Sequence, residues 1–284
     1  MTAAQTARFT VGRIFLYIVL IVVALSMLLP FFWMIITSVK EQGEVFTFPP
    51  TFIPSGKWHW ENFLKVVSVE NFGRFLLNTC IVTASVVAGS LFINSLSAYA
   101  FARLKFVGRN VLFMLYLATM MIPWVITVIP SYIIVFKLRW LDTFASLIIP
   151  GLAGVYGIFL LRQFFLTLPV ELEDAALIDG CGRFRIFWTI FIPLSRPALA
   201  TLGVFTFMGV WTDFLWPYLM ANSDKIRTLE VGLLVFRKSM LGWYIMDWPL
   251  LMSASTVVLL PVVIVFLFTQ RFYVKGIALT GMKL

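Results

Sequence analysis

The feature that most constrains this chain is a series of apolar runs, most of them long enough to cross a bilayer as a helix. The runs extend near Ile14 to Ile36, Phe75 to Ala102, Val111 to Val135, Phe144 to Leu161, Ala198 to Met220 and Leu251 to Phe268. Crossing the hydrocarbon core takes about 20 apolar residues of helix. Backbone groups in lipid must find their hydrogen bonds within the segment. The sequence therefore predicts an all-α polytopic membrane protein with six transmembrane helices.

The composition agrees with a bilayer protein and argues against two other classes. Hydrophobic residues make up 61% of the 284 positions and charged residues 12%, against roughly 45–50% and 25% in soluble domains. The net charge of +9 comes from single Lys and Arg residues between apolar runs, which is typical of membrane-protein loops rather than nucleic-acid binding. One His and the separated Cys80 and Cys181 offer no metal site and no disulfide framework.

The first run resembles a signal peptide because Arg8 and Arg13 precede it. It exceeds a signal-peptide core of about 7–15 residues and lacks a small-x-small cleavage site, so we expect a retained span. We divide the chain into an N-terminal helix with an external loop (1–71), a five-helix core (72–270) and a cytoplasmic C-terminal tail (271–284). The Lys and Arg bias toward the cytoplasm, with both termini inside, has the expected sign but is small.

The longest predicted inner loop, residues 162–197, carries signals of a structured segment. Its first half holds three acids, Glu171, Glu173 and Asp174. Acids are favoured in the first turns of a helix, and Gly180 is suited to the left-handed cap that ends one. We therefore predict a helix of about ten residues, with the small Ala175 and Ala176 at its centre.

Aromatic residues at helical spacing follow this helix and reach Pro193. At this point the loop resembles the EAA loop of binding-protein-dependent ABC importer permeases, whose pattern is Glu-Ala-Ala, three residues, Gly, nine residues, Ile-x-Leu-Pro. Here Asp174-Ala175-Ala176 is followed by Gly180 and then by Ile190-Phe191-Ile192-Pro193. Asp174 replaces Glu and Ile192 replaces Leu. The blocks WTDFLWP, RTLEVGL and QRFYVKG resemble the sugar-transporting branch that includes the smaller maltose permease subunit. The likeness covers roughly Phe72 to the end.

The resemblance implies a type I ABC importer permease fold in a bacterial inner membrane, with both termini cytoplasmic and no enzyme activity of its own. It also implies a second permease subunit, two ATPase subunits that hold ATP and Mg, and an external solute-binding protein. The chain itself has no G-x-x-x-x-G-K-[ST] nucleotide loop, and we expect no cofactor on it. By resemblance, the residues that couple to the ATPase are Asp174, Ala175, Ala176, Gly180, Ile190 and Pro193.

Asp213 is the one acid that we place within a predicted span, and Trp211 and Trp216 flank it. A carboxylate in a span is costly and should face protein or water. One interpretation is a polar contact on a sugar pathway, with both tryptophans as stacking surfaces. The other is an aromatic belt at the outer interface, and the sequence does not separate the two.

Two rival classes lack the residues that they need. An intramembrane enzyme needs a convergent catalytic set, and a secondary transporter usually has more ionisable midplane residues and inverted repeats. An oligosaccharide is the expected substrate, with a glycerol phosphodiester or phosphate as the alternative.

Overall fold

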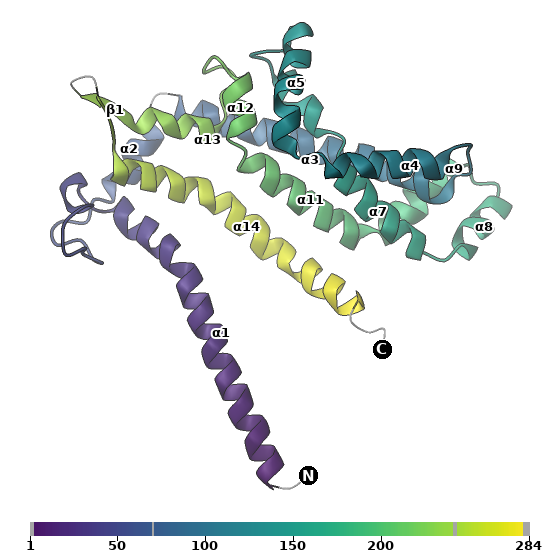
Figure 1. Cartoon of the computed structure of the whole chain (residues 1–284), viewed down its shortest axis with the longest axis horizontal. Helices are drawn as coiled ribbons and strands as arrows, with labels where there is room; N and C mark the ends of the chain where they lie inside the picture. Colours follow the sequence, from purple (N-terminus) through teal and green to yellow (C-terminus); the bar gives the residue numbers. More distant parts are fainter. Residues whose placement is uncertain (1–2, 70, 241–242, 281–284) are drawn as a thin grey trace. The chain divides into compact units, whose positions relative to one another are not determined.

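The computed structural model describes residues 3–69, 71–240 and 243–280, and most of that length is helical (Figure 1). The α-helices are α1 (Ala3–Ser38), α2 (Glu61–Ser68), α3 (Phe72–Arg103), α4 (Arg109–Ala118), α5 (Trp124–Lys137), α6 (Phe144–Ile148), α7 (Val155–Thr167), α8 (Glu171–Ile178), α9 (Arg183–Ile186), α10 (Ile192–Leu194), α11 (Arg196–Trp211), α12 (Leu215–Met220), α13 (Leu229–Gly232) and α14 (Trp248–Thr280). The tighter 3-10 turns are η1 (Gln42–Glu44), η2 (Thr119–Met121), η3 (Ile149–Gly151) and η5 (Leu233–Phe236), and η4 (Phe187–Phe191) is a π-helix.

Two short strands interrupt the helical chain. β1 (Arg237–Met240) and β2 (Trp243–Met246) pair antiparallel, in a hairpin that was not predicted from the sequence. The last helix continues to Thr280, so residues 271–280 of the expected tail extend α14. Residues 281–284 of that tail lie outside the described residues.

The spans are consistent with a six-helix membrane protein. Four helical segments are long and apolar enough to cross a membrane singly, namely Arg13–Ser38, Phe72–Arg103, Phe144–Thr167 and Trp248–Gln270. Two bent pairs reach that criterion together, Arg109–Met121 with Trp124–Lys137 and Arg183–Leu194 with Arg196–Trp211. By length and composition, the described residues therefore hold four spans, or up to six if each bent pair is one span.

The expected third span, Val111 to Val135, is not one continuous helix. It is broken at Ile122 and Pro123, and the two helices on either side are bent by 105°. Ile122 is extended, with φ −83° and ψ 115°, which is the conformation that a following proline favours.

The expected fifth span, Ala198 to Met220, is also divided. α11 ends at Trp211 and α12 begins at Leu215. Pro217 has no N–H to donate to the carbonyl of Asp213 four residues earlier. The break therefore places Asp213 in a short non-helical segment rather than inside a helix.

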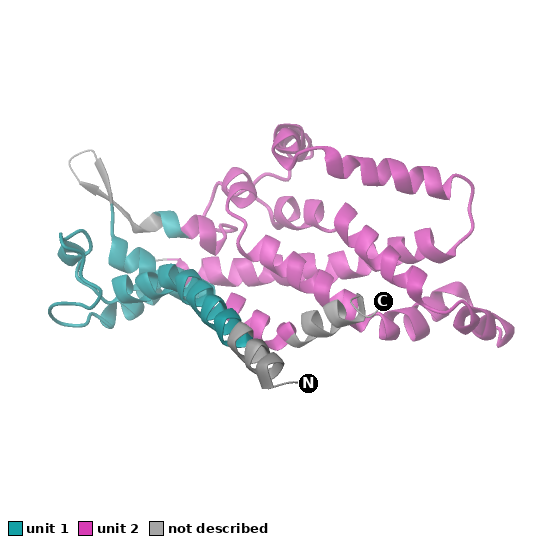
Figure 2. Cartoon of the chain, turned by 60° about the horizontal axis from the view of Figure 1, so that its bottom comes forward, with its two compact units in different colours: residues 1–70, 233–259 teal, residues 71–232, 260–284 magenta. Residues whose placement is uncertain are grey.

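The chain forms two compact units, residues 1–70 with 233–259 and residues 71–232 with 260–284 (Figure 2). In the second unit, α3 packs along both α7 and α11. Glycines allow this close approach, since a Cβ added at Gly157 would lie 2.7 Å from Nδ2 of Asn94. The side-chain Oδ1 of Asn94 in turn accepts a hydrogen bond from the Gly154 N–H at 3.0 Å.

The first unit is organised around the end of α1. The carbonyl of Ser38 accepts hydrogen bonds from Asn62 and from Ser253, each at 3.0 Å. Lys40 is almost fully buried and donates from Nζ to the carbonyl of Thr51. Its ammonium also lies 4.9 Å from the ring centroid of Trp33. These contacts fix the chain where it leaves the first helix.

Candidate functional site

The predicted loop helix is present as α8, and its end has the predicted geometry. Gly180 has φ +77°, the left-handed conformation that glycine adopts without steric cost. The N–H of Gly180 bonds to the carbonyl of Leu177 at 3.0 Å, and the N–H of Cys181 bonds to that of Ala176 at 2.9 Å. These two bonds define a Schellman motif. The helix therefore stops sharply after eight residues.

The two faces of α8 differ in burial. Glu173 and Ala176, three residues apart and so on one face, are 5% and 7% exposed. Asp174 and Ala175 are exposed, and Ile178 is 86% exposed. One face of α8 is thus held by its own chain, while the other presents an acid and apolar side chains.

Arg103, the last residue of α3, connects α8 to the helix bundle. Its Nη2 donates to the carbonyls of Phe165 and Leu168 at 2.6 and 2.5 Å, at the end of α7, where helical carbonyls lack their usual i+4 partners. Its Nη1 lies 3.9 Å from Oε2 of Glu173, and both side chains are more than nine-tenths buried. Arg183 pairs with the other carboxylate oxygen of Glu173. We call Arg103, Glu173 and Arg183 the loop clamp.

The segment after α8 returns to the bundle through a π-helix. Phe187 and Phe191 are buried, and the Arg103 guanidinium lies 5.1 Å from the ring centroid of Phe191. Pro193 lies two residues after Phe191 and has no N–H to donate to the carbonyl of Thr189. A π-turn is one way for a helix to accommodate such a missing bond.

The structure divides the predicted coupling residues into two groups. Asp174, Ala175, Gly180 and Pro193 are exposed. Ala176 belongs to the buried core, and Ile190 packs against it. The small side chain of Ala176 therefore lets α8 approach its own bundle rather than another surface.

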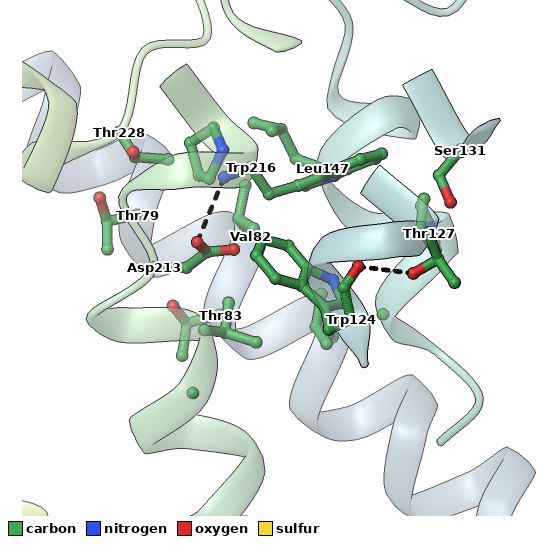
Figure 3. A pocket seen from close by; sticks show the side chains of 16 residues that line it. Thr79, Val82, Thr83, Trp124, Thr127, Ser131, Leu147, Asp213, Trp216 and Thr228 are labelled. Carbon is green, nitrogen blue, oxygen red and sulfur yellow. Dashed lines mark hydrogen bonds between the residues drawn. The ribbon is translucent and has the colours of Figure 1, made fainter. Parts of the chain in front are cut away.

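A second candidate site is a cavity of about 530 Å³ in the second unit. It is lined by Thr79, Val82, Thr83, Val86, Trp124, Thr127, Ser131, Leu147, Pro150, Gly151, Gly209, Val210, Asp213, Trp216, Pro217 and Thr228. Figure 3 shows three threonines, Thr79, Thr83 and Thr228, on one side of Asp213 and Trp124 on the other. The cavity combines a carboxylate, several hydroxyls and an aromatic surface.

The predicted pathway residues are only partly brought together. Asp213 lines the cavity and accepts a hydrogen bond from the backbone N–H of Trp216 at 3.3 Å. Trp216 also lines it, but its indole N–H donates to the carbonyl of Ser146 at 2.9 Å. Trp211 is buried, stacks on Phe207 at 5.4 Å between ring centroids, and is not among the lining residues. The lining aromatic side chain most open to a ligand is Trp124, which is 52% exposed and was not among the predicted pathway residues.

Two of the cavity hydroxyls are buried without a hydrogen-bond partner among the described residues. Thr83 and Thr228 are 3% and 5% exposed, and neither Oγ1 has a partner. Thr79, by contrast, donates to the carbonyl of Phe75 at 2.9 Å and accepts from the N–H of Leu229 at 2.8 Å. Buried polar groups normally find partners. The orphaned hydroxyls therefore indicate a place for a polar ligand or water beside Asp213.

Comparison with known proteins gives consistent matches over nearly the whole chain. Residues 90–279 match the family described as "Binding-protein-dependent transport system inner membrane component". The sn-glycerol-3-phosphate transport system permease protein UgpE of Yersinia pestis is 35% identical over 272 residues, which cover 93% of this chain and 95% of that protein. The arabinooligosaccharides transport system permease protein AraQ of Halalkalibacterium halodurans is 32% identical over 248 residues, covering 87% and 86%.

A solved structure shares the fold. It is a bacterial ABC transporter involved in the import of the acidic polysaccharide alginate, and the matched chain superposes with a TM-score of 0.80. The sequence identity is 22%, and the match covers 96% of this chain and 99% of that chain.

Proposed function

Because the chain belongs to the family of binding-protein-dependent transport inner membrane components, we propose that it forms half of the membrane pathway of an ATP-driven carbohydrate importer. A second permease subunit forms the other half, and an external binding protein delivers the solute. ATP and Mg bind to two separate ATPase subunits. Both termini and the loop 162–197 lie on the cytoplasmic side.

The observation that carries this proposal is the attachment of one face of α8 to the helix bundle, which leaves the other face exposed. Its exposed face carries Asp174 and Ala175, while the loop clamp ties its other face to the ends of α3 and α7. A helix held in this way moves with the bundle rather than independently of it. Motion of a docked ATPase is thereby passed to the membrane helices, which shift between two packings.

Each predicted coupling residue has a distinct role in this arrangement. Asp174 faces the ATPase as a charged contact, and Ala175 allows close approach of the two backbones. Gly180 sets where the docking helix ends. Pro193 and Ile190 shape the return segment, and Ala176 seats α8 on its own core.

The cavity beside Asp213 supplies the solute contact on this subunit. The break between α11 and α12 lets the carboxylate reach the cavity, which supports the pathway interpretation of Asp213 over the interface belt. Trp124 offers a flat apolar face and the threonines offer hydroxyls. Carbohydrates present both kinds of surface, and pockets that bind small ligands combine apolar walls with a few polar groups. Trp216 forms part of the wall, and Trp211 supports the end of α11.

The proposal is tested by transport with the complete complex. The permease pair, the ATPase and the cognate binding protein would be purified and reconstituted in proteoliposomes with ATP on the ATPase side. We expect at least one carbohydrate in a panel of mono- and oligosaccharides to stimulate ATP hydrolysis and to accumulate across the membrane. If no carbohydrate did either, the carbohydrate assignment would be wrong.

The proposed orientation is tested by labelling Leu177→Cys in a chain without its native cysteines. Leu177 is partly exposed on α8, so a thiol there should react readily with a reagent on its own side. We expect a membrane-impermeant maleimide to label it in inside-out vesicles and not in intact cells. Labelling in intact cells would reverse the topology.

Gly180→Leu tests whether the end of α8 matters for ATPase docking. Leucine must adopt the left-handed backbone at this position, which costs roughly 1–2 kcal/mol, so the helix end should rearrange. We expect the ATPase retained on the purified permease to fall by up to about tenfold, since about 1.4 kcal/mol corresponds to tenfold in affinity.

Gly182→Leu is the matched control for this substitution. Gly182 has φ −70° and ψ 154°, and an added Cβ there has open space around it, as at Gly180. The control should therefore retain the ATPase, and Gly180→Asn should be intermediate because asparagine tolerates the left-handed region. Equal retention in all three variants would show that the cap geometry is irrelevant to docking.

A further inference from the structure

The charge carried by the cavity lining is negative, with no positive charge among the described lining residues. Among the sixteen described residues that line it, Asp213 alone carries an ionisable side chain, and none of the sixteen is Lys, Arg or His. The remaining polar side chains are the hydroxyls of the threonines and Ser131 and the indoles of Trp124 and Trp216. The indole N–H of Trp216 already donates to the carbonyl of Ser146. The lining therefore offers a negative charge and neutral hydrogen-bonding groups.

This charge pattern bears differently on neutral and anionic solutes. A neutral polyol can donate hydroxyl protons to Asp213 and bond with the orphaned Thr83 and Thr228. An anion would lose its hydration and would be repelled by the Asp213 carboxylate. No cation among the described lining residues offsets the desolvation or the repulsion. Charge interactions are stronger in a cavity with low-dielectric walls than in bulk water. Placing like charges together at a binding site can cost several kcal/mol.

We propose that the Asp213 cavity makes this subunit selective for uncharged, hydroxyl-rich solutes and excludes anionic sugars and phosphate esters. This inference rests on the proposed transport function and narrows its substrate class. The criterion would group the chain with the relative named for arabinooligosaccharides and distinguish it from those named for the anionic solutes sn-glycerol-3-phosphate and alginate. Selectivity of this kind works through repulsion of the wrong ligand as well as attraction of the right one.

The first test measures the charge preference of the cavity without any substrate. Ser131→Cys would be made in a chain carrying Cys80→Ser and Cys181→Ser, because both native thiols are free, and the chain would be purified within its complex. The rates of modification by a trimethylammonium-ethyl and by a sulfonatoethyl methanethiosulfonate would then be compared. The same two rates on free 2-mercaptoethanol give the intrinsic ratio.

We expect the cationic reagent to be favoured at Ser131→Cys by about tenfold over the intrinsic ratio, because charged clefts concentrate counter-ions by at least that factor. Adding Asp213→Asn should return the ratio to within about twofold of the intrinsic value, whereas Asp213→Glu should preserve it. An unchanged ratio in Asp213→Asn would overturn the proposal. Failure of both reagents to reach Ser131→Cys would do the same.

The second test uses transport, and it distinguishes a failure of the proposed charge selectivity from a failure of the proposed importer function. The reconstituted complex would be offered a galactose disaccharide and the matching galacturonic acid disaccharide, which differ only by carboxylates in place of CH₂OH groups, together with a glycerol phosphodiester. The neutral sugar alone is expected to be carried. Uptake of an anionic member alone would overturn the charge selection while leaving the importer assignment intact. If no carbohydrate of any charge were carried, the proposed function would fail, while the thiol measurement would still report the charge of the cavity.

Discussion

Arg103→Met is expected to leave the protein inserted in the membrane but to release most of the ATPase. Methionine keeps much of the apolar stem of the arginine side chain but removes its guanidinium. That group donates hydrogen bonds to the carbonyls of Phe165 and Leu168 and pairs with one carboxylate oxygen of Glu173. Breaking a buried pair by removing one partner typically costs about 3–5 kcal/mol. This cost falls on the junction that holds α8, because the bonds join the end of α3 to the end of α7 and to Glu173 of α8.

The measurement is the amount of ATPase that copurifies with the permease, together with ATP-dependent uptake. We expect a loss of at least about tenfold, since about 1.4 kcal/mol of lost docking energy already gives that factor. Lys105→Met is the control, because it removes the same charge from an exposed side chain two residues further along the chain. Glu173→Gln should show a smaller loss, as it keeps the shape of the side chain and some hydrogen bonding.

A purely structural role for Arg103 would give a different pattern. Arg103→Met would then lower the yield or thermal stability of the permease, while the permease that folds would hold wild-type amounts of ATPase. Wild-type docking in the folded fraction would therefore contradict the clamp as a mechanical connection.

The helical part of the fold could be predicted from the sequence because lipid leaves the backbone few alternatives. The positions of the breaks were harder to predict. Pro30 and Pro261 lie inside the continuous helices α1 and α14, whereas Pro123 and Pro217 adjoin breaks. A proline removes one hydrogen bond wherever it stands. Whether the helix continues depends on neighbouring segments, which the local sequence does not specify.

Local and long-range features also differ in how well they could be predicted within the loop 162–197. The cap at Gly180 is a local feature, since glycine at the end of an acidic helix is itself a signal. The clamp is not local, because Arg103 and Glu173 are distant in the sequence and meet only when α3 packs against α7 and the chain turns into α8. The spacing of three puts Glu173 and Ala176 on one face of the helix, but only the structure shows that this face packs against the core.

The cavity was predictable only at Asp213 and Trp216. Its wall combines side chains from α3, α5 and the segments around η3 and α12. Thr83, Trp124 and Thr228 have ordinary sequence surroundings, so nothing distinguishes them before the helices are assembled. An acid in an apolar run is unusual enough to be noticed, whereas a threonine is not.

Glu173 is buried and Asp174 is exposed, and the second large effect is expected at Asp174. Asp174→Lys should abolish ATP-driven uptake while leaving insertion and the loop clamp intact, because Asp174 is exposed and Glu173 makes the internal ion pairs. Lysine near the start of α8 opposes the helix dipole by about 0.3–1 kcal/mol. Against a basic group on the ATPase, the reversed charge adds a penalty of several kcal/mol.

The expected loss of bound ATPase for Asp174→Lys is therefore about a hundredfold or more, because each 1.4 kcal/mol corresponds to about tenfold. Asp174→Glu restores the acid of the family pattern and should retain docking. Glu41→Lys makes the same charge reversal at an exposed site in another part of the chain and controls for net charge. If Asp174→Lys kept wild-type ATPase and uptake, the exposed face of α8 would not be the docking surface. The role of Asp174 in coupling would then have to be abandoned, even if the clamp behind it held α8 as described.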